Sequence, residues 1–145
     1  MAHKTLADAE VAAPPGTLLC QVITPEKTVF AKTVDFVALP LYDGELGVFP
    51  SRAPMLGRLG YGELRVKIGG TTESYFVDGG FAQVRDNVVT VLTNRALAPS
   101  AIEMNGTAAK LDEALKRPAV TDAEVAEKTK EVARLRAMIH VSQKS

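Results

Sequence analysis

The hydrophobic period of this chain changes near Pro99, and that change limits the folds that the chain can adopt. From Leu18 to about Thr93, short β-rich runs are separated by turn signals roughly 8 to 12 residues apart, a spacing typical of antiparallel sandwiches. After Pro99, apolar residues recur at helical spacing instead. The sequence therefore predicts an α+β fold, in which an N-terminal antiparallel β-sandwich is followed by a C-terminal antiparallel two-helix hairpin.

Tight turns mark the boundaries of the predicted strands. Gly69-Gly70 separates the alternating run ELRVKI from TTESYFV, and two such residues between strands predict a β-hairpin. Asp86-Asn87 separates FAQVR from VVTVLTN in the same way. Asp78-Gly79-Gly80 predicts one more reversal of the chain.

Two capping boxes predict where the helices begin. Glu103 follows Ser100 by three positions and Glu124 follows Thr121 by the same spacing, which satisfies backbone N–H groups at a helix start. Pro118 ends the first helix, and the linker of about four residues predicts antiparallel helices. The expected apolar stripes are Met104, Ala108, Leu111 and Leu115 on the first helix, and Val125, Val132, Leu135 and Ile139 on the second.

These patterns divide the chain into three parts. We expect a flexible arm over residues 1–16, a β-sandwich domain over 17–97 and an αα-hairpin domain over 98–145. Two short helices bury too little apolar surface to offset the ordering of their backbone, so the hairpin depends on docking against the sandwich. The stability of the docked hairpin is predicted to be marginal, and a partner can shift a marginal equilibrium between the docked and undocked states.

Composition excludes several classes of protein. The 145 residues include 17 Lys and Arg and 17 Asp and Glu, so the chain lacks a basic field and no nucleic-acid partner is expected. No apolar run approaches the roughly 18 residues of a spanning helix. The first residues, with Asp8 and Glu10, resemble neither a secretory signal nor an Arg-rich transit peptide. Cys20, the only cysteine, lies in an apolar run and is expected to be buried.

Residue patterns for catalysis are sparse. The sequence has no GxxxxGK[ST] phosphate loop and no GxSxG turn. His3 and His140 have no partner at metal-binding spacing, so neither a metal nor a cofactor is expected, and His140 suits the C-terminus of a helix. Asp35, Asp43 and Glu45 are interpreted as solvated loop charges rather than an acid–base pair. We therefore expect a protein that is not an enzyme.

The stretch GELGVFPSRAPML, residues 44–56, is predicted to be a shaped loop. Gly44 and Gly47 allow backbone angles that other residues avoid, and the two prolines stiffen the return. Glu45 and Arg52 would then lie on a rigid rim, which suits a protein–protein contact because it loses little entropy on binding. The expected anchors to the core are Leu46, Val48, Phe49, Met55 and Leu56. From these residues alone, a partner surface and a structural turn are equally open.

The same stretch resembles the GELGI-x-P-x-H-A-P-L signature of the ε subunit of F-type ATP synthases, called δ in mitochondria. The resemblance extends from about Leu18 to the C-terminus. LLCQVITPEKTVFAKTVDFVALP is similar to the family's opening strands, and YFVDGGFAQVRDNVVTVL is similar to its GG and NxVTVL segments. ALAPSAIE then leads into the helices, as in the family.

This resemblance implies a non-catalytic subunit of the rotary central stalk, which couples the γ subunit to the membrane c-ring for ATP synthesis. It implies a peripheral position on the cytoplasmic face of the bacterial inner membrane, with membrane association only through the complex. In bacterial relatives the hairpin also extends towards the catalytic α and β subunits and inhibits ATP hydrolysis. The implied interface residues are Gly44, Glu45, Leu46, Gly47 and Arg52 in the sandwich, and Lys130, Arg134 and Arg136 on the second helix.

The sequence departs from the family pattern at two places. Arg52 replaces the histidine of the loop signature, so a fixed cation stands where the family has a titratable group. Some bacterial members bind ATP through an I/L-D-x-x-R-A motif, which here is degenerate. The matching stretch begins with Ile102 and Glu103 but has Gly106 and Thr107 in place of Arg and Ala. Weak or absent ATP binding is therefore expected.

Two other functions are weighed against the stalk subunit. A stand-alone β-sandwich that binds a small molecule or carbohydrate would need exposed aromatic side chains, yet aromatic residues are only 6% of the chain and tryptophan is absent. An enzyme on a sandwich scaffold would need a metal site or a catalytic dyad, and the sequence shows neither pattern. Co-purification with γ would distinguish the stalk subunit from both.

Overall fold

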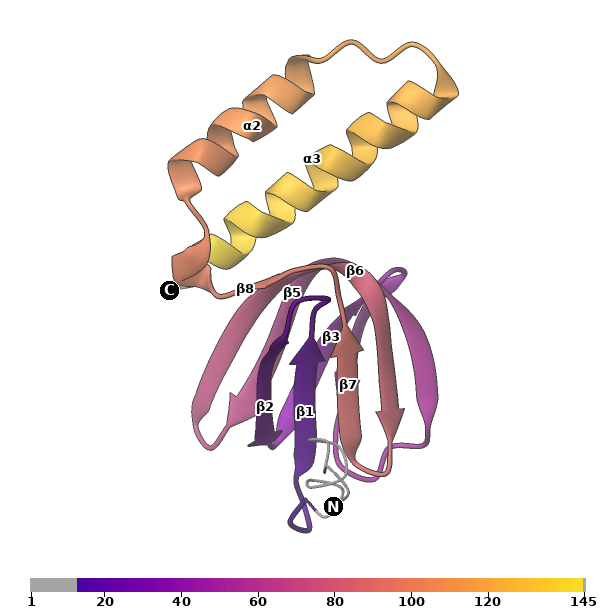
Figure 1. Cartoon of the computed structure of the whole chain (residues 1–145), viewed down its shortest axis with the longest axis vertical. Coiled ribbons are helices and arrows are strands. Elements are labelled where there is room, and N and C mark those ends of the chain that lie inside the picture. The colour runs from indigo at the N-terminus through magenta and orange to yellow at the C-terminus, as the bar shows by residue number, and fades with distance from the viewer. Residues whose placement is uncertain (1–12, 145) are drawn as a thin grey trace.

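The computed structural model describes residues 13–144, which form one eight-stranded sheet followed by two helices (Figure 1). The strands are β1 (Leu18–Ile23), β2 (Thr28–Val34), β3 (Phe36–Leu41), β4 (Gly44–Val48), β5 (Met55–Ile68), β6 (Thr71–Arg85), β7 (Val88–Leu92) and β8 (Ala96–Leu97). A 3-10 turn, η1 (Pro99–Ala101), leads to α2 (Met104–Lys116) and α3 (Asp122–Ser142). The predicted α+β class is confirmed. Most of the arm predicted over residues 1–16, including His3, lies outside the described residues.

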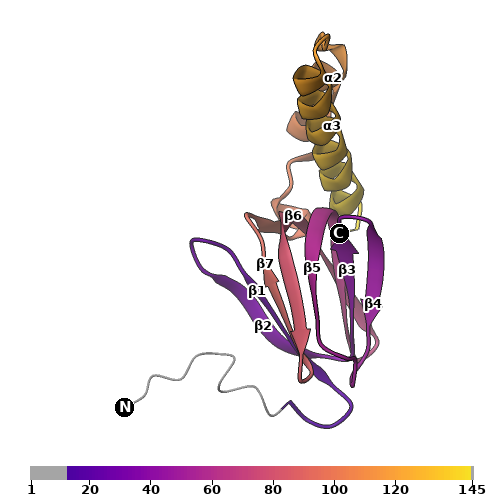
Figure 2. The same ribbon diagram turned by 90° about the vertical axis from the view of Figure 1, so that its right-hand side faces the viewer.

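The strand order of the sheet is β2-β1-β7-β6-β5-β3-β4, and β8 pairs with β6. All pairs are antiparallel except β1 with β7, which is parallel. The sheet folds into two layers, with β1, β2 and β7 on one side and β3 and β4 on the other (Figure 2). The main core lies between these layers and contains fully buried residues such as Leu18, Val37, Leu64 and Val89. It accounts for the alternating apolar pattern of the strands.

Two of the three predicted turns are confirmed. Ile68 pairs with Thr71, so Gly69-Gly70 closes a two-residue hairpin. Asp86 and Asn87 close another with φ angles of 51° and 62°. The reversal predicted at Gly79-Gly80 is wrong, because β6 continues through both glycines. Their positive φ angles, 69° and 108°, occur within the strand, which pairs with β8 before them and with β7 after them.

The starts of the two helices are specified differently. Thr121 and Glu124 form the predicted capping box at the start of α3, and that prediction is confirmed. The box predicted from Ser100 is wrong, because Ser100 lies in η1. Glu103 is itself the N-cap of α2, and its carboxylate accepts hydrogen bonds from the backbone N–H groups of Asn105 and Gly106. The carboxylate thus takes over the role expected of the Ser100 hydroxyl.

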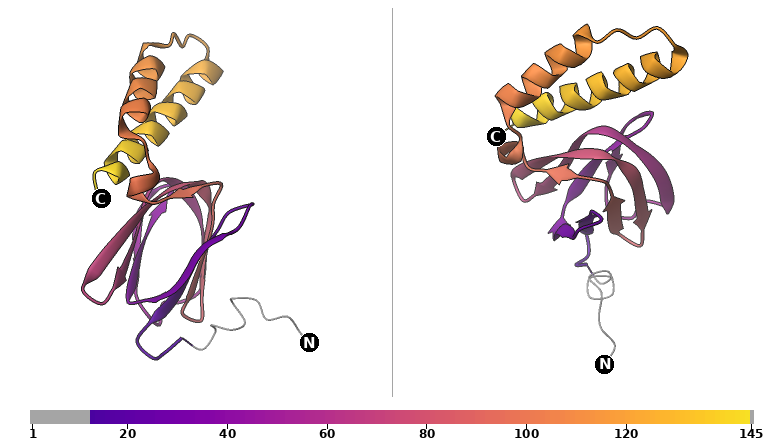
Figure 3. Two further views of the ribbon diagram at one scale, coloured as in Figure 1. Left: turned by 60° about the vertical axis from the view of Figure 1, so that its left-hand side comes forward. Right: turned by 45° about the horizontal axis from the view of Figure 1, so that its top comes forward.

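The helices run side by side as a hairpin that projects from one end of the sandwich (Figure 3). The predicted stripes are only partly correct. Met104, Leu115 and Val125 are exposed, whereas Leu135 of the predicted set is buried. The residues that α2 buries are Thr107 and Ala114, and those that α3 buries are Leu135, Met138 and Val141. Burial is concentrated near the C-terminal end of α3 because only that end packs on the sandwich.

Candidate partner-binding surfaces

The stretch expected to be one loop over residues 44–56 is in fact a strand, a loop and the start of another strand. Gly44–Val48 forms β4, which pairs with β3 at one edge of the sheet. The loop is limited to residues 49–54. Figure 2 shows β4 beginning beside the helices and ending at the far end of the sandwich. The single rim expected to carry Glu45 and Arg52 is therefore wrong, because these residues lie towards opposite ends of β4.

The charge of Glu45 is balanced within the sheet. Its carboxylate accepts a hydrogen bond from the Arg65 guanidinium at 2.7 Å, and both side chains are partly exposed. Leu46 is half-buried against the main core, as expected of an anchor. Gly47 leaves room for the ring of Phe36, since a Cβ atom there would lie 3.0 Å from that ring. At the β4 edge, Gly47 therefore packs closely on Phe36, and the Glu45 carboxylate is already paired with Arg65.

The loop over residues 49–54 has a restrained backbone and exposed side chains. Ser51 adopts a φ of 69°, which is uncommon for a residue other than glycine. Its backbone N–H donates to the Asn87 side chain at 2.6 Å, which fixes the loop to the β6–β7 turn. Phe49 packs its ring against Phe36 with centroids 4.7 Å apart but is 64% exposed. Arg52 is exposed, and no interaction partner for it occurs in residues 13–144.

An apolar surface that sequence reasoning missed lies on the outer face of β5, β6 and β7. Phe81 pairs directly with Leu92, and Leu56 pairs with Gln83, two residues after Phe81, so all four side chains share one face. Phe81, Leu92 and Leu56 are 53%, 50% and 72% exposed. The expectation that Phe49 and Leu56 anchor the loop to the core is therefore wrong. Side chains alternate between the two faces along FAQVR, so Phe81 lies on the face opposite to that of the buried Ala82. This alternation is the sequence signal that could have revealed the surface.

The hairpin is attached to the sandwich through a second, smaller core. Phe76 of β6 is fully buried against Leu135 and Val141 of α3, together with Ile102 and Ala114. These residues come from the sheet, the linker and both helices. The apolar contact between sandwich and hairpin therefore lies at the base of the hairpin.

Glu63 of β5 provides a polar anchor for the same end of α3. Its carboxylate accepts a hydrogen bond from Ser74 at 2.7 Å and lies 3.3 Å from His140 Nε2 and 3.9 Å from Lys144 Nζ. The Glu63 side chain is only 11% exposed. His140 lies in the last turn of α3, as expected, and the structure also places it against Glu63. No local sequence pattern indicates this contact, because the residues are far apart in the chain.

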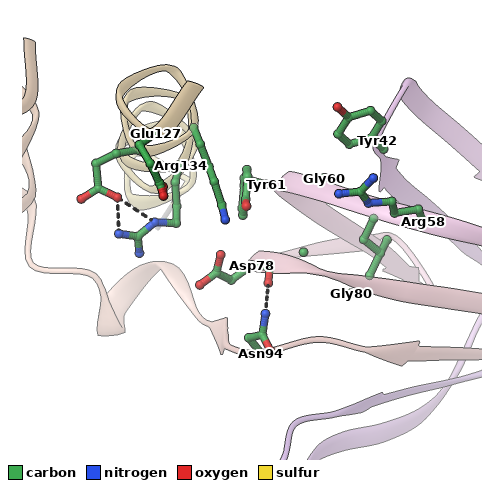
Figure 4. Close-up of a pocket in the computed structure, with 13 residues that line it drawn as sticks. Tyr42, Arg58, Gly60, Tyr61, Asp78, Gly80, Asn94, Glu127 and Arg134 are labelled. Carbon is green, nitrogen blue, oxygen red and sulfur yellow. Dashed lines mark hydrogen bonds and ion pairs between the residues drawn. The ribbon is translucent and has the colours of Figure 1, made fainter. Parts of the chain in front are cut away.

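A polar cleft of about 500 Å³ separates the middle of α3 from the sandwich (Figure 4). Lys130 and Arg134 line it from the helix, and Asp78 lines it from the sheet. The Glu131 carboxylate accepts hydrogen bonds from the Arg134 guanidinium, and this contact raises the pKa of Arg134. Arg136 instead lines a groove between the two helices. The three cations expected to form one basic face therefore lie in two different places.

The residues of the degenerate ATP motif have structural roles. Ile102 is 7% exposed and belongs to the core that holds the hairpin. Both carboxylate oxygens of Glu103 are occupied by backbone N–H groups of α2 at 2.6 and 3.0 Å. Thr107 is buried and its hydroxyl donates to the Glu103 carbonyl. In this conformation Ile102 is packed in a core and Glu103 caps α2.

Cys20 and the possible metal ligands are the remaining groups of chemical interest in the described part of the chain. Burial raises the pKa of the Cys20 thiol to about 12, so this cysteine is buried, as predicted, and unreactive. Among residues 13–144, no group of three His, Cys, Asp or Glu side chains is arranged to hold a metal ion. None of the helices in the same range has the length and apolar character needed to span a membrane.

Comparison with known proteins identifies the family. The family described as "ATP synthase, Delta/Epsilon chain, beta-sandwich domain" matches residues 17–99, which include every strand. The chain belongs to this family. An ATP synthase epsilon chain of Rhodopirellula baltica is 48% identical over 126 residues, which cover 87% of this chain and 98% of that protein. One from Nitratidesulfovibrio vulgaris strain DP4 is 41% identical over 70% of this chain and 75% of its own length.

Solved structures show the same fold. A chain in the mitochondrial ATP synthase of Euglena gracilis superposes with a TM-score of 0.77 at 22% identity, over 95% of this chain and 87% of that one. A chain in the central stalk and c-ring structure of the Tetrahymena thermophila enzyme gives a TM-score of 0.66 at 14% identity, over 86% and 96%. The first likeness covers nearly all of this chain, so it extends to the hairpin as well as the sandwich.

Proposed function

We propose that this chain is the ε-type rotor subunit of a proton-translocating F-type ATP synthase, which couples the γ subunit to the membrane c-ring. The observation that carries the proposal is the family match over all eight strands, together with relatives named as epsilon chains. The matched Tetrahymena structure is described as a central stalk and c-ring. In this role the chain is non-catalytic and lies at the cytoplasmic face of the bacterial inner membrane through its partners alone.

Two sandwich surfaces suit the two neighbours of such a subunit. The apolar face with Phe81, Leu92 and Leu56 has the character of a stable protein contact, and we assign it to γ. The beginning of β4, with Gly44 and Glu45, is assigned to the c-ring, in line with the family resemblance. The family match argues against a stand-alone sandwich that binds small molecules, because it places the chain among subunits of an assembly.

Co-purification tests the proposed function directly. A tagged full-length chain should retain γ and the c-ring when the complex is solubilised from membranes. Phe81→Ser should reduce γ retention by about tenfold, because a central apolar contact becomes polar. Lys110→Ser is a matched control, since Lys110 is exposed on α2 and remote from that face. Wild-type chain that recovers neither γ nor the ring would rule out the rotor assignment.

We further propose that the hairpin undocks and inhibits ATP hydrolysis. Its attachment at one end and the open cleft beneath α3 support this idea, because separation breaks one small core and the Glu63 contacts with His140 and Lys144. Lys130 and Arg134 line the cleft in the docked state and would then become available to acidic segments of the catalytic α and β subunits, along with Arg136. Deleting residues 100–145 should leave assembly and ATP synthesis largely intact and increase hydrolysis. Unchanged hydrolysis in such membranes, with full-length chain as the control, would contradict inhibition.

Nucleotide control of the hairpin is not expected in this chain. Glu103 caps α2, and Gly106 offers no guanidinium to a phosphate. Titration calorimetry with MgATP should therefore show no binding at micromolar concentrations. Gly106→Arg is the informative comparison, because it restores a missing cation. A Cβ atom there would lie 2.9 Å from a carboxylate oxygen of Glu103, so the flexible Glu103 side chain must shift to admit it. Micromolar affinity in the wild-type chain would overturn this expectation.

A further inference from the structure

We propose that His140 makes the docking of the hairpin sensitive to pH. When its imidazole is protonated, it forms an ion pair with the Glu63 carboxylate, and this pair exists only while α3 lies on the sandwich. Acidic pH therefore favours the docked hairpin, and rising pH favours its release. The effect on docking is a property of this chain alone. A consequence for ATP hydrolysis rests in addition on the inhibitory role proposed above.

Glu63 lies on the surface that α3 covers. It pairs with Phe76 across β5 and β6, and residues directly opposite each other in an antiparallel pair share one face. Phe76 is fully buried in the cluster that joins α3 to the sandwich. The Glu63 side chain is only 11% exposed, and its carboxylate lies 3.3 Å from His140 Nε2. A charge shielded from water attracts an opposite charge more strongly than a charge in open water does.

His140 is the only histidine in residues 13–144. Histidine is the side chain that ordinarily changes its charge between pH 5 and 8. The one cysteine stays neutral in this range, because burial raises the pKa of the Cys20 thiol to about 12. Carboxylates, lysines and arginines ordinarily keep their charge across it. Among the side chains that the structure describes, a change of pH in this range therefore acts at the base of the hairpin.

The charged neighbours of His140 on the helices keep their charge in this range. Arg136 precedes it by about one turn of α3, and Lys144 follows beyond the end of the helix. Lys144 Nζ lies 3.9 Å from the same carboxylate, which therefore retains one cation after the histidine loses its proton. At the start of α2, the Glu103 carboxylate accepts hydrogen bonds from backbone N–H groups of its own helix. The next charged residue of α2 is Lys110, further from the base.

The sheet adds three titratable side chains on the face that α3 covers, and these are Tyr61, Arg65 and Asp78. The Arg65 guanidinium donates to Glu45 at 2.7 Å. Asp78 lies 3.8 Å from Arg95. Phenol side chains are ordinarily neutral between pH 5 and 8, and the η1 turn has no titratable side chain. Within residues 13–144, Glu63 is therefore the one carboxylate at ion-pair distance from the histidine.

The direction of the effect follows from what each state offers the imidazole. The C-terminal end of α3 moves together with His140, so its dipole favours protonation in the docked and undocked states alike. The Glu63 carboxylate is a partner in the docked state only, so protonation favours docking. This contribution is present while the imidazole is protonated and is lost as rising pH removes the proton. Because the imidazole is 58% exposed, we expect a change of about threefold in the docking equilibrium.

Hydrogen exchange of the full-length chain tests the inference. Protection of the amides around Leu135 in α3 is measured for wild type and for His140→Gln between pH 5.5 and 8. The ratio of the two at each pH cancels the intrinsic pH dependence of exchange. This ratio should be about three at pH 5.5 and approach one at pH 8. A ratio that stays constant with pH overturns the inference.

Two further variants identify the partner of His140. Glu63→Gln, made in both backgrounds, removes the charge but keeps an acceptor for Ser74, so the ratio should become independent of pH. Lys144→Gln is the matched control, because it removes a charge beside the same carboxylate and should leave the pH dependence in place. Protection of β1 and β7 shows whether each variant folds, and if Glu63→Gln does not, the ratio of wild type to His140→Gln decides alone. A pH dependence that persists in folded Glu63→Gln contradicts the pairing.

Hydrolysis measurements separate this inference from the proposed inhibition. In membranes, inhibition is the ratio of hydrolysis without residues 100–145 to hydrolysis with the full-length chain. With wild-type chain this ratio should rise between pH 6 and 8, whereas with His140→Gln it should already be at its higher value at pH 6. A pH-dependent exchange ratio without any inhibition supports the inference and rejects the inhibitory role. A constant exchange ratio in a chain that does inhibit rejects the inference and retains that role.

Discussion

Gly80 is the residue with the least freedom to change in this fold. Its φ of 108° is unfavourable for any side chain, and a Cβ atom there would lie 1.9 Å from the carbonyl oxygen of Leu92. That oxygen belongs to the strand paired with β6, so it cannot move without disrupting the sheet. The same glycine allows β6 to bend between its partners β7 and β8. The bend at Gly80 therefore affects both the shape of the sandwich and the position of β8, which leads into the linker that carries the hairpin.

Gly80→Ala should therefore destabilise the protein by more than about 2 kcal/mol, because it combines backbone strain with an overlap that the paired strand cannot relieve. Urea unfolding followed by circular dichroism measures the change. Gly70→Ala is the matched control, because Gly70 has no positive φ and a Cβ atom there would meet nothing within 4 Å. Equal stability of the two variants would show that β6 does not need a glycine at its bend.

At the scale of elements, the Glu63 carboxylate, which is only 11% exposed, adds a polar anchor to the apolar attachment of α3. Glu63→Ala removes the acceptor of Ser74 and the partner of His140 and Lys144, so we expect docking of the hairpin to weaken by roughly 1–2 kcal/mol. Limited trypsin digestion should then cut α3 faster, while the strands stay protected. Glu113→Ala is the control, because Glu113 is exposed on α2. Identical digestion of both variants would contradict the role of Glu63 as an anchor.

The elements also show which parts of the fold are readable from sequence. Local patterns predicted correctly the two-residue hairpins and the capping box of α3, because turn and cap geometry depends on adjacent residues. Gly79-Gly80 was misinterpreted as a reversal, because a bend within a strand uses the same residue type as a turn. The helix stripes were only partly correct because burial depends on where α3 meets the sandwich. The Glu63 contacts join residues distant in sequence, and no local pattern encodes them.

At the scale of the whole molecule, most of the buried apolar side chains among the described residues form two clusters. One lies between the layers of the sandwich, and the other joins Phe76, the linker and both helices. Phe76 is the buried β-strand residue in the second cluster. Because the clusters are separate, release of the hairpin, as proposed above, would leave the sandwich core intact. Such a structure is consistent with a stalk subunit whose body stays fixed while its helices change position.

A pair of core substitutions tests this separation. Leu135→Ala should weaken the hairpin cluster by about 2–5 kcal/mol, which is enough to release helices of marginal stability. Leu64→Ala makes the same chemical change in the sandwich core and should lower the stability of the whole protein. Hydrogen exchange read by mass spectrometry distinguishes the two results. Leu135→Ala should increase exchange in residues 104–142 and leave β1, β3 and β7 protected, whereas Leu64→Ala should increase exchange everywhere. If Leu135→Ala loosened the strands as much as Leu64→Ala did, the two clusters would be one cooperative unit, and a hairpin that moves on a fixed body would be excluded.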